Sequence, residues 1–205
     1  MVAHHNGTGD TKKKTNPRWR IADIVVASVI AVAMGVIFWI WSQGYTVIAA
    51  VTTAFPPLAG LYTGGWLIAG VLGGLLIRKP GAALYCELIA AAVEGLLGTH
   101  FGMTVIISGL LQGFAAELAF AAFRYRTWNL PVTLLAGLFS GIALGVNENF
   151  LYNAEWAVEW KLMYVLLTAV SGVVIAGLLS WMGYKGLRQT GVLSGLASGR
   201  ATNRI

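Results

Sequence analysis

The chain has 205 residues, of which 57% are hydrophobic and 11% charged, and its mean hydropathy is +0.72. Soluble domains carry about 25% charged residues, so this composition excludes an ordinary soluble protein and indicates an integral membrane protein. The net charge of +6 does not indicate nucleic-acid binding, because the basic residues sit at the ends of apolar segments. The single cysteine, Cys86, excludes a disulfide framework and a cysteine-based metal cluster within the chain.

Residues 1–20 form a polar segment that lacks apolar periodicity and ends in Arg18 and Arg20. We expect a disordered, basic cytoplasmic tail here. No cleavable signal peptide is expected, because no short apolar core with a small-residue cleavage site follows the basic residues.

Six apolar segments follow and predict membrane-spanning helices at residues 21–41, 58–77, 83–97, 103–123, 131–151 and 162–184. Most have about 20 residues, the length needed to cross a hydrocarbon core about 30 Å thick. The third is short, which is tolerable if it is buried among the others and ends at a water-filled cavity. We therefore predict an all-α integral membrane protein, with six transmembrane helices in a compact bundle over residues 21–184. Residues 185–205 form a second cytoplasmic tail, loosely structured from Gly186.

Basic residues predict the orientation of these spans. In a six-span arrangement only Lys161 falls on one side, and the other side carries Lys12 to Lys14, Arg18, Arg20, Arg78, Lys79, Arg124, Arg126, Lys185, Arg188, Arg200 and Arg204. The positive-inside rule then places both termini in the cytoplasm of a multi-pass protein of the cell membrane. Residues 42–57, on the outer side, are too apolar for a solvated loop. They are either a re-entrant lid over a site or an extension of the flanking helices.

Three glutamates, Glu87, Glu94 and Glu117, lie within the apolar spans. A carboxylate at bilayer depth costs a few kcal/mol, so such residues are rare and mark functional sites by default. Glu87 and Glu94 are seven residues apart and share one helix face. Their separation of about 10 Å along the helix axis is too large for the two carboxylates to share a proton. Carboxylates at different depths fit a cavity or relay for a cationic, ring-containing solute, which aromatic faces also attract. Glu148 is a weaker indication of a functional site than these three glutamates, because it lies near the outer interface, where its carboxylate can reach water.

Small residues at helical spacing form stripes on three predicted helices: Ala27, Ala31 and Gly35; Gly102, Gly109 and Gly113; and Gly137, Gly141 and Gly145. Such stripes allow another helix backbone to approach closely. The second stripe continues to Glu117 and would turn it, with Gln112 beside it, into a tight helical interior. The first could pack within the molecule or against another subunit, and spacing does not choose between them.

Hydrolytic motifs are absent from the sequence, which has no G-x-S-x-G and no H-E-x-x-H. His100 is the one histidine close to a predicted span. We expect no catalytic residue, no metal site and no cofactor in this chain.

One stretch carries more specific motifs: Arg78-Lys79-Pro80-Gly81-Ala82-Ala83-Leu84, Glu87, Ile89-Ala90-Ala91, Val93-Glu94, Leu96-Leu97-Gly98, Gln112-Gly113, Ala116-Glu117 and Arg124. Together with Trp66, it resembles the YkoE-type membrane subunit of energy-coupling-factor (ECF) transporters. These are ABC-type importers, and this subunit is their substrate-binding S component. The similarity runs over all six predicted spans.

The resemblance implies a subunit that captures thiamine or its hydroxymethylpyrimidine precursor from outside, with the first loop as its lid. A transmembrane coupling (T) subunit and ATPase subunits on other chains would supply ATP hydrolysis. By this likeness the candidate substrate-binding residues are Glu87, Glu94, Gln112, Glu117 and Trp66. Further candidates at the outer mouth are Glu148, Tyr152 and Trp156, where the aromatic side chains could instead form an interfacial belt. Ala27 and Ala31, with Gly35 on the same ridge, would dock on the coupling subunit. The expected partners are these chains and the lipid bilayer. Nucleic acid is not an expected partner.

Three other interpretations stay open at this point. The chain could be a self-sufficient, proton-coupled secondary transporter of a small cationic or heteroaromatic solute, with the glutamates as a proton relay. It could be an intramembrane enzyme, although no nucleophile or metal set is visible. It could also be a scaffold whose glutamates only pack.

Overall fold

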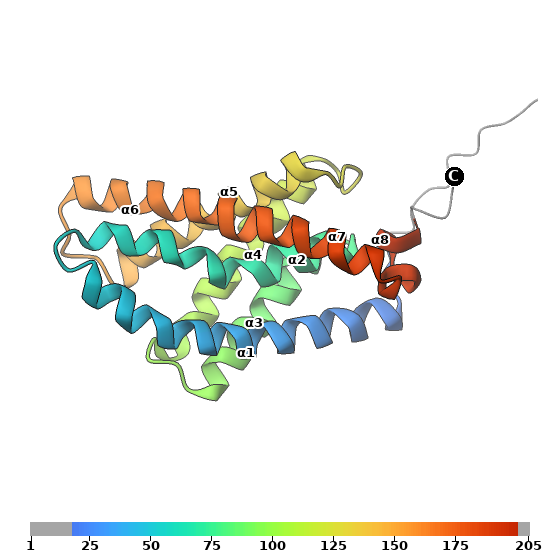
Figure 1. Ribbon diagram of the computed structural model, residues 1–205, viewed down its shortest axis with the longest axis horizontal. Coiled ribbons are helices and arrows are strands. Elements are labelled where there is room, and N and C mark those ends of the chain that lie inside the picture. Colours follow the sequence, from blue (N-terminus) through green and yellow to red (C-terminus); the bar gives the residue numbers. More distant parts are fainter. Residues whose placement is uncertain (1–17, 201–205) are drawn as a thin grey trace, which may run out of the picture.

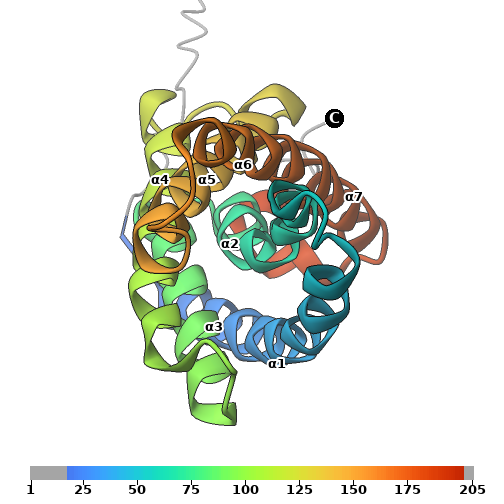
Figure 2. The same ribbon diagram turned by 90° about the vertical axis from the view of Figure 1, so that its left-hand side faces the viewer.

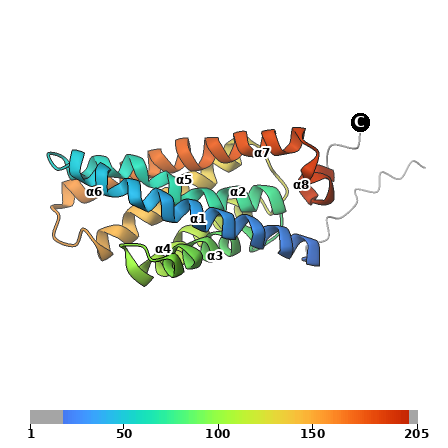
Figure 3. The ribbon, with the colours of Figure 1, turned by 60° about the horizontal axis from the view of Figure 1, so that its bottom comes forward.

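A computed structural model describes residues 18–200 of the chain, and within that range every regular element is helical. The elements run α1 (Ile21–Val51), η1 (Pro56–Leu67), α2 (Ile68–Ile77), α3 (Ala82–Leu97), η2 (Gly102–Thr104), α4 (Val105–Ala122), α5 (Leu130–Leu151), α6 (Val158–Ser171), the π-helical η3 (Gly172–Leu179), α7 (Ser180–Gln189), η4 (Val192–Gly195) and α8 (Ala197–Arg200). The helices α1, η1–α2 and α6–α7 run side by side along the longest axis (Figures 1 and 3), and α3 and α4 lie obliquely to them in Figure 1. The prediction of an all-α protein is confirmed.

Five helical stretches in the described residues are long and apolar enough to cross a membrane: Ile21–Val51, Pro56–Ile77, Gly102–Ala122, Leu130–Leu151 and Val158–Gln189. Four of the six predicted spans lie entirely within these stretches, and a fifth, 103–123, extends past its stretch by one residue, Phe123. The remaining helix, α3, has 16 residues and so a length of about 24 Å, less than the core it would have to cross. A sixth span and a cytoplasmic location of both termini therefore stay predictions.

The helix α1 is longer than its predicted span, because it continues without a break to Val51. The re-entrant lid considered for residues 42–57 is therefore wrong, and the helical extension is correct. Residues 42–51 contain no proline that would remove a helical hydrogen bond. Pro56 and Pro57 instead begin η1, where the missing amide hydrogens cost little.

The segment that follows Gly186 is also more ordered than the sequence suggests. α7 continues to Gln189, and η4 and α8 follow it. Leu193 and Leu196 are buried, and an Arg20 guanidinium nitrogen donates to the Gly195 carbonyl oxygen at 3.0 Å. The expected loose structure is therefore wrong for residues 186–200, which lie at the same end of the molecule as the start of α1 (Figure 1).

The stretch formed by η1 and α2 lies at the centre of the bundle, with α1, α3 and α7 around it in the end-on view (Figure 2). Most of it is buried, and its glycines let neighbouring helices approach. A methyl group at Gly70 would meet the Glu87 carboxylate at 3.0 Å. This close approach of α2 and α3 is what brings Glu87 into the interior.

The predicted small-residue stripes mediate helix packing inside the molecule. Methyl groups at Gly109 and Gly113 of α4 would lie 2.5 Å and 2.8 Å from the Cβ atoms of Ala91 and Glu87 on α3. The stripe of Gly137, Gly141 and Gly145 on α5 faces α6 and η3 in the same way. These contacts confirm the close backbone approach that the spacing predicts.

The ridge on α1 also faces inward, which contradicts its predicted role as a docking surface. Ala27 and Ala31 are fully buried, and both belong to a hydrophobic cluster with Leu75, Leu76 and Cys86. Gly35 packs on α3, where a methyl group would meet the Val93 Cβ at 2.5 Å. The ridge is consumed by packing within the chain, so in this structure it offers no surface to a coupling subunit.

Candidate substrate-binding site

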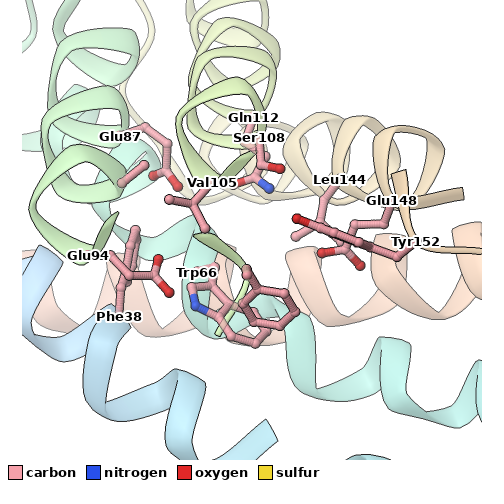
Figure 4. Close-up of a pocket in the computed structure, with 12 residues that line it drawn as sticks. Phe38, Trp66, Glu87, Glu94, Val105, Ser108, Gln112, Leu144, Glu148 and Tyr152 are labelled. Carbon is pink, nitrogen blue, oxygen red and sulfur yellow. The ribbon is translucent and has the colours of Figure 1, made fainter. Parts of the chain in front are cut away.

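Six of the eight candidate substrate-binding residues surround one cavity, which has a volume of about 30 Å³. Its lining comes from α1, η1, α3, α4, α5 and the turns that follow α3 and α5 (Figure 4): Phe38, Trp66, Glu87, Ala91, Glu94, Phe101, Val105, Ser108, Gln112, Leu144, Glu148 and Tyr152. A volume of this size accommodates one or two water molecules. Sites for small organic ligands have about 300 Å³ or more, so a vitamin-sized ligand requires side chains to move.

The Glu87 side chain forms one wall of the cavity and is 1% exposed. One of its oxygens, Oε2, accepts a hydrogen bond of 2.5 Å from the Gly70 amide. The other, Oε1, is buried and has no hydrogen-bond partner among the described residues. Leaving a buried acceptor unsatisfied costs about 1–3 kcal/mol. The carboxylate is therefore suited to accept a hydrogen bond from a donor that enters the cavity.

The Glu94 side chain is positioned by α1 and η1. The Ser42 hydroxyl donates a short hydrogen bond to Glu94 Oε1, and the Trp66 indole N–H donates to Ser42 Oγ at 3.3 Å. Glu94 is 2% exposed and Trp66 is 7% exposed. This chain of hydrogen bonds fixes the carboxylate beside the indole ring, so an acceptor and an aromatic surface face the same space.

The opposite wall of the cavity comes from α5 and the residue after it. The Tyr164 hydroxyl donates a short hydrogen bond to Glu148, which places this carboxylate at the cavity rather than in the outer solvent. The Tyr152 hydroxyl lies 2.6 Å from Thr104 Oγ1. Burial is the main reason that the pKa of Tyr152 is raised above its ordinary value, so the phenol stays neutral.

Phe101 covers the cavity from the turn between α3 and η2. Its ring centroid lies 5.6 Å from that of Trp66, 5.4 Å from that of Tyr45 and 5.7 Å from that of Tyr152. These distances are typical of favourable aromatic pairs. The ring therefore contacts η1, α1 and the residue that follows α5.

Two candidate residues lie elsewhere. Glu117 accepts hydrogen bonds from the backbone amides of Gly81, Ala83 and Leu84 at 2.7 Å, 2.9 Å and 3.3 Å. It therefore caps the amino end of α3 and does not line the cavity. Trp156 packs edge-on against Trp160 and Tyr164, so it lies behind Tyr164 and also outside the cavity lining.

Several lining residues were not among the candidates predicted from the sequence. Ser108 lies one helical turn before Gln112, so its place on the same face of α4 could have been predicted. It accepts a 2.8 Å hydrogen bond from the Asn147 side chain. Phe101 carries no comparable signal, because its role depends on the path of a turn. The same holds for Ser42, which positions Glu94 from outside the lining and does so only because α1 is extended. Within residues 18–200 no three His, Cys, Asp or Glu side chains are grouped so as to hold a metal ion.

Comparisons with known proteins agree with this architecture. Residues 22–143 match a family model described as an ABC-type cobalt transport system, permease component. A protein of Bacillus subtilis (strain 168) named as the HMP/thiamine permease protein YkoE is 37% identical over 185 residues, which cover 89% of this chain and 91% of that protein. A crystal structure of an S-component of an ECF transporter superimposes with a TM-score of 0.86 at 36% identity, and the match covers 91% of this chain and 94% of that one.

Proposed function

Because the chain belongs to the YkoE-type family of ECF-transporter S components, we propose that it is the substrate-capturing subunit of an ATP-driven importer of thiamine or hydroxymethylpyrimidine. In this role the chain binds its substrate and catalyses no reaction. A transmembrane coupling subunit and ATPase subunits work with it in the cell membrane. The name of the relative from Bacillus subtilis supports the choice of substrate.

The observation that carries the proposal is the set of three carboxylates, Glu87, Glu94 and Glu148, around one small cavity with aromatic walls. Thiamine joins a thiazolium cation to an aminopyrimidine ring. Carboxylates compensate the charge of the cation and accept hydrogen bonds from the amino group, while Trp66 and Phe101 offer ring surfaces to either heterocycle.

Within the cavity, the proposal gives each side chain a role. Glu87, whose Oε1 has no hydrogen-bond partner within residues 18–200, accepts from an N–H of the substrate. Gln112, which is 4% exposed and lines the same wall, has an amide that can pair with a ring nitrogen or its substituent. Glu94 and Glu148 face the positive charge.

Titration calorimetry on the purified chain tests the proposal. We expect the chain alone to bind thiamine or hydroxymethylpyrimidine, and Glu87→Gln or Glu94→Gln to weaken binding by about 10- to 100-fold, as expected for a hydrogen bond to a charged group. Glu155→Gln is the matched control, because Glu155 is exposed and lies outside the cavity lining. If the unmodified chain binds neither compound nor a related pyrimidine, the assigned substrate is wrong.

A self-sufficient secondary transporter is distinguished by reconstitution. Liposomes that contain only this chain should accumulate no thiamine under a pH gradient, because the proposed subunit needs ATPase partners. Accumulation of thiamine driven by the pH gradient alone would contradict the proposed capture role and would support a proton relay formed by the glutamates.

A further inference from the structure

The cavity is too small in this structure for a heterocyclic substrate, which raises the question of which segment moves to enlarge it. A cavity of about 30 Å³ is far smaller than the sites that hold small organic ligands. The following inference rests on the proposed function, since it concerns how a substrate reaches that cavity. It requires a segment that covers the site and is free to move.

The turn between α1 and η1, residues 52–55, is poorly placed for this role. None of its residues lines the cavity. Phe55 packs against Trp160, with ring centroids 5.9 Å apart. Displacing this turn would leave the Phe101 ring still in place above Glu94.

The turn between α3 and η2 has the required geometry. It begins at Gly98 and ends at Gly102, which have φ angles of +84° and +65°. Only glycine adopts such angles without strain, so both positions absorb backbone rotation easily. Between them the Gly102 amide donates to the Thr99 carbonyl oxygen at 3.0 Å, which makes residues 99–102 a compact unit between two pivots.

Phe101 is the one side chain of this turn that lines the cavity. Its ring is held by ring contacts alone. The polar contacts that fasten the turn include one between the Thr99 side chain and the Glu94 carboxylate, which opening must break. The Trp39 indole N–H donates to the Gly98 carbonyl oxygen at 3.2 Å, and Thr104 Oγ1 shares a 2.6 Å hydrogen bond with the Tyr152 hydroxyl. Segments with few buried contacts and exposed hydrogen bonds are those that open locally at low free-energy cost.

We propose that residues 98–102 are the gate of the cavity and that Phe101 is its plug. Rotation about Gly98 and Gly102 lifts the ring from Trp66 and Tyr152 and connects the carboxylates with the outside. When a heterocyclic substrate has entered, the ring returns and packs on it. The α1–η1 turn stays in place during this exchange.

A first experiment needs no substrate. In a Cys86→Ala background, Ser108→Cys places a thiol in the cavity, and its labelling by a water-soluble methanethiosulfonate reagent reports opening. Adding Phe101→Ala should accelerate labelling by about tenfold or more, because local opening no longer limits access. Adding Phe55→Ala, the matched control on the other turn, should leave the rate unchanged. Equal rates with and without Phe101, or acceleration by Phe55→Ala, would overturn the proposal.

A second variant separates gating from binding, because Thr104 fastens the turn but does not line the cavity. Thr104→Val should raise both the association and the dissociation rate of thiamine by about fivefold or more, because it removes two hydrogen bonds. Thr104 Oγ1 donates one to the Phe101 carbonyl oxygen and shares the other with the Tyr152 hydroxyl. The Kd should change by less than about twofold, since both rates share the gate. Unchanged rates would contradict the gate. If the parent chain binds no thiamine, the substrate assignment fails, while the thiol-labelling rates still decide where the gate lies.

Discussion

Replacing Glu117 with glutamine should destabilise the protein and leave its substrate affinity unchanged. The carboxylate accepts hydrogen bonds from the amides of Gly81, Ala83 and Leu84 at the start of α3. The first amides of a helix have no partner within the helix, and the helix dipole favours a negative charge there. The substitution removes that charge and turns an amide donor toward backbone donors.

The size of the effect follows from these contacts. Glutamine retains one acceptor oxygen, so either the Gly81 contact of 2.7 Å or the contacts of the other oxygen are lost. A hydrogen bond to a charged group contributes about 1.5–3 kcal/mol, and the dipole adds up to about 2 kcal/mol at a partly buried site. Glu117 is 8% exposed, so water can replace few of the lost hydrogen bonds. We expect a loss of about 2–4 kcal/mol in the free energy of unfolding.

Thermal unfolding in detergent and calorimetric titration with thiamine measure the two quantities separately. Glu94→Gln is the comparison, because it should lower affinity with a smaller effect on unfolding. If Glu117→Gln instead weakens thiamine binding tenfold at unchanged unfolding temperature, Glu117 acts as a substrate ligand and the capping explanation is incorrect.

Three further predictions concern packing and pH. A methyl group at Gly137 would overlap the Gly172 carbonyl on η3, so Gly137→Ala should lower the free energy of unfolding by about 1–3 kcal/mol. Gly183→Ala, where the nearest atom lies 3.9 Å away, should be neutral or stabilising by less than about 1 kcal/mol. Ala27→Leu should destabilise the isolated chain by a similar 1–3 kcal/mol, because Ala27 is fully buried; a defect seen only in assembly with other subunits would speak against this. Burial lowers the pKa of His100, so the unfolded state binds its proton first and acidification through that pKa destabilises the turn. The labelling rate of the cavity thiol, divided by that of an exposed cysteine to correct for the loss of thiolate, should rise at low pH, and His100→Gln should abolish that rise.

Sequence reasoning located the cavity correctly where it relied on the helical period. Glu87 and Glu94 meet at one space because seven residues return α3 to the same face. The glycines at 109 and 113 show which face of α4 packs on α3, and Gln112 follows from that. These inferences need only residues within one helix or on two adjacent ones.

The same reasoning failed for Glu117 and for the ridge of Ala27 and Ala31. A buried carboxylate can accept hydrogen bonds from a bound ligand or from the free amides at the start of a helix, and the sequence alone does not distinguish the two. Only the crossing of α3 and α4 places the Gly81 amide beside Glu117. A small-residue ridge fits any helix that approaches it. The pairing of α1 with α2 and α3 buries this one.

Composition and periodicity by themselves determined that this is a helical membrane protein, where most of its spans lie, and which side chains share a face. These properties follow from the transfer of side chains into hydrocarbon and from a repeat of 3.6 residues, both of which act between neighbours in the chain. Only the tertiary structure decided which faces meet, that α1 extends to Val51 and that Phe101, rather than a residue of the turn after α1, lines the cavity. Those outcomes depend on close packing between segments far apart in sequence, where many small contacts select one arrangement among several of similar composition.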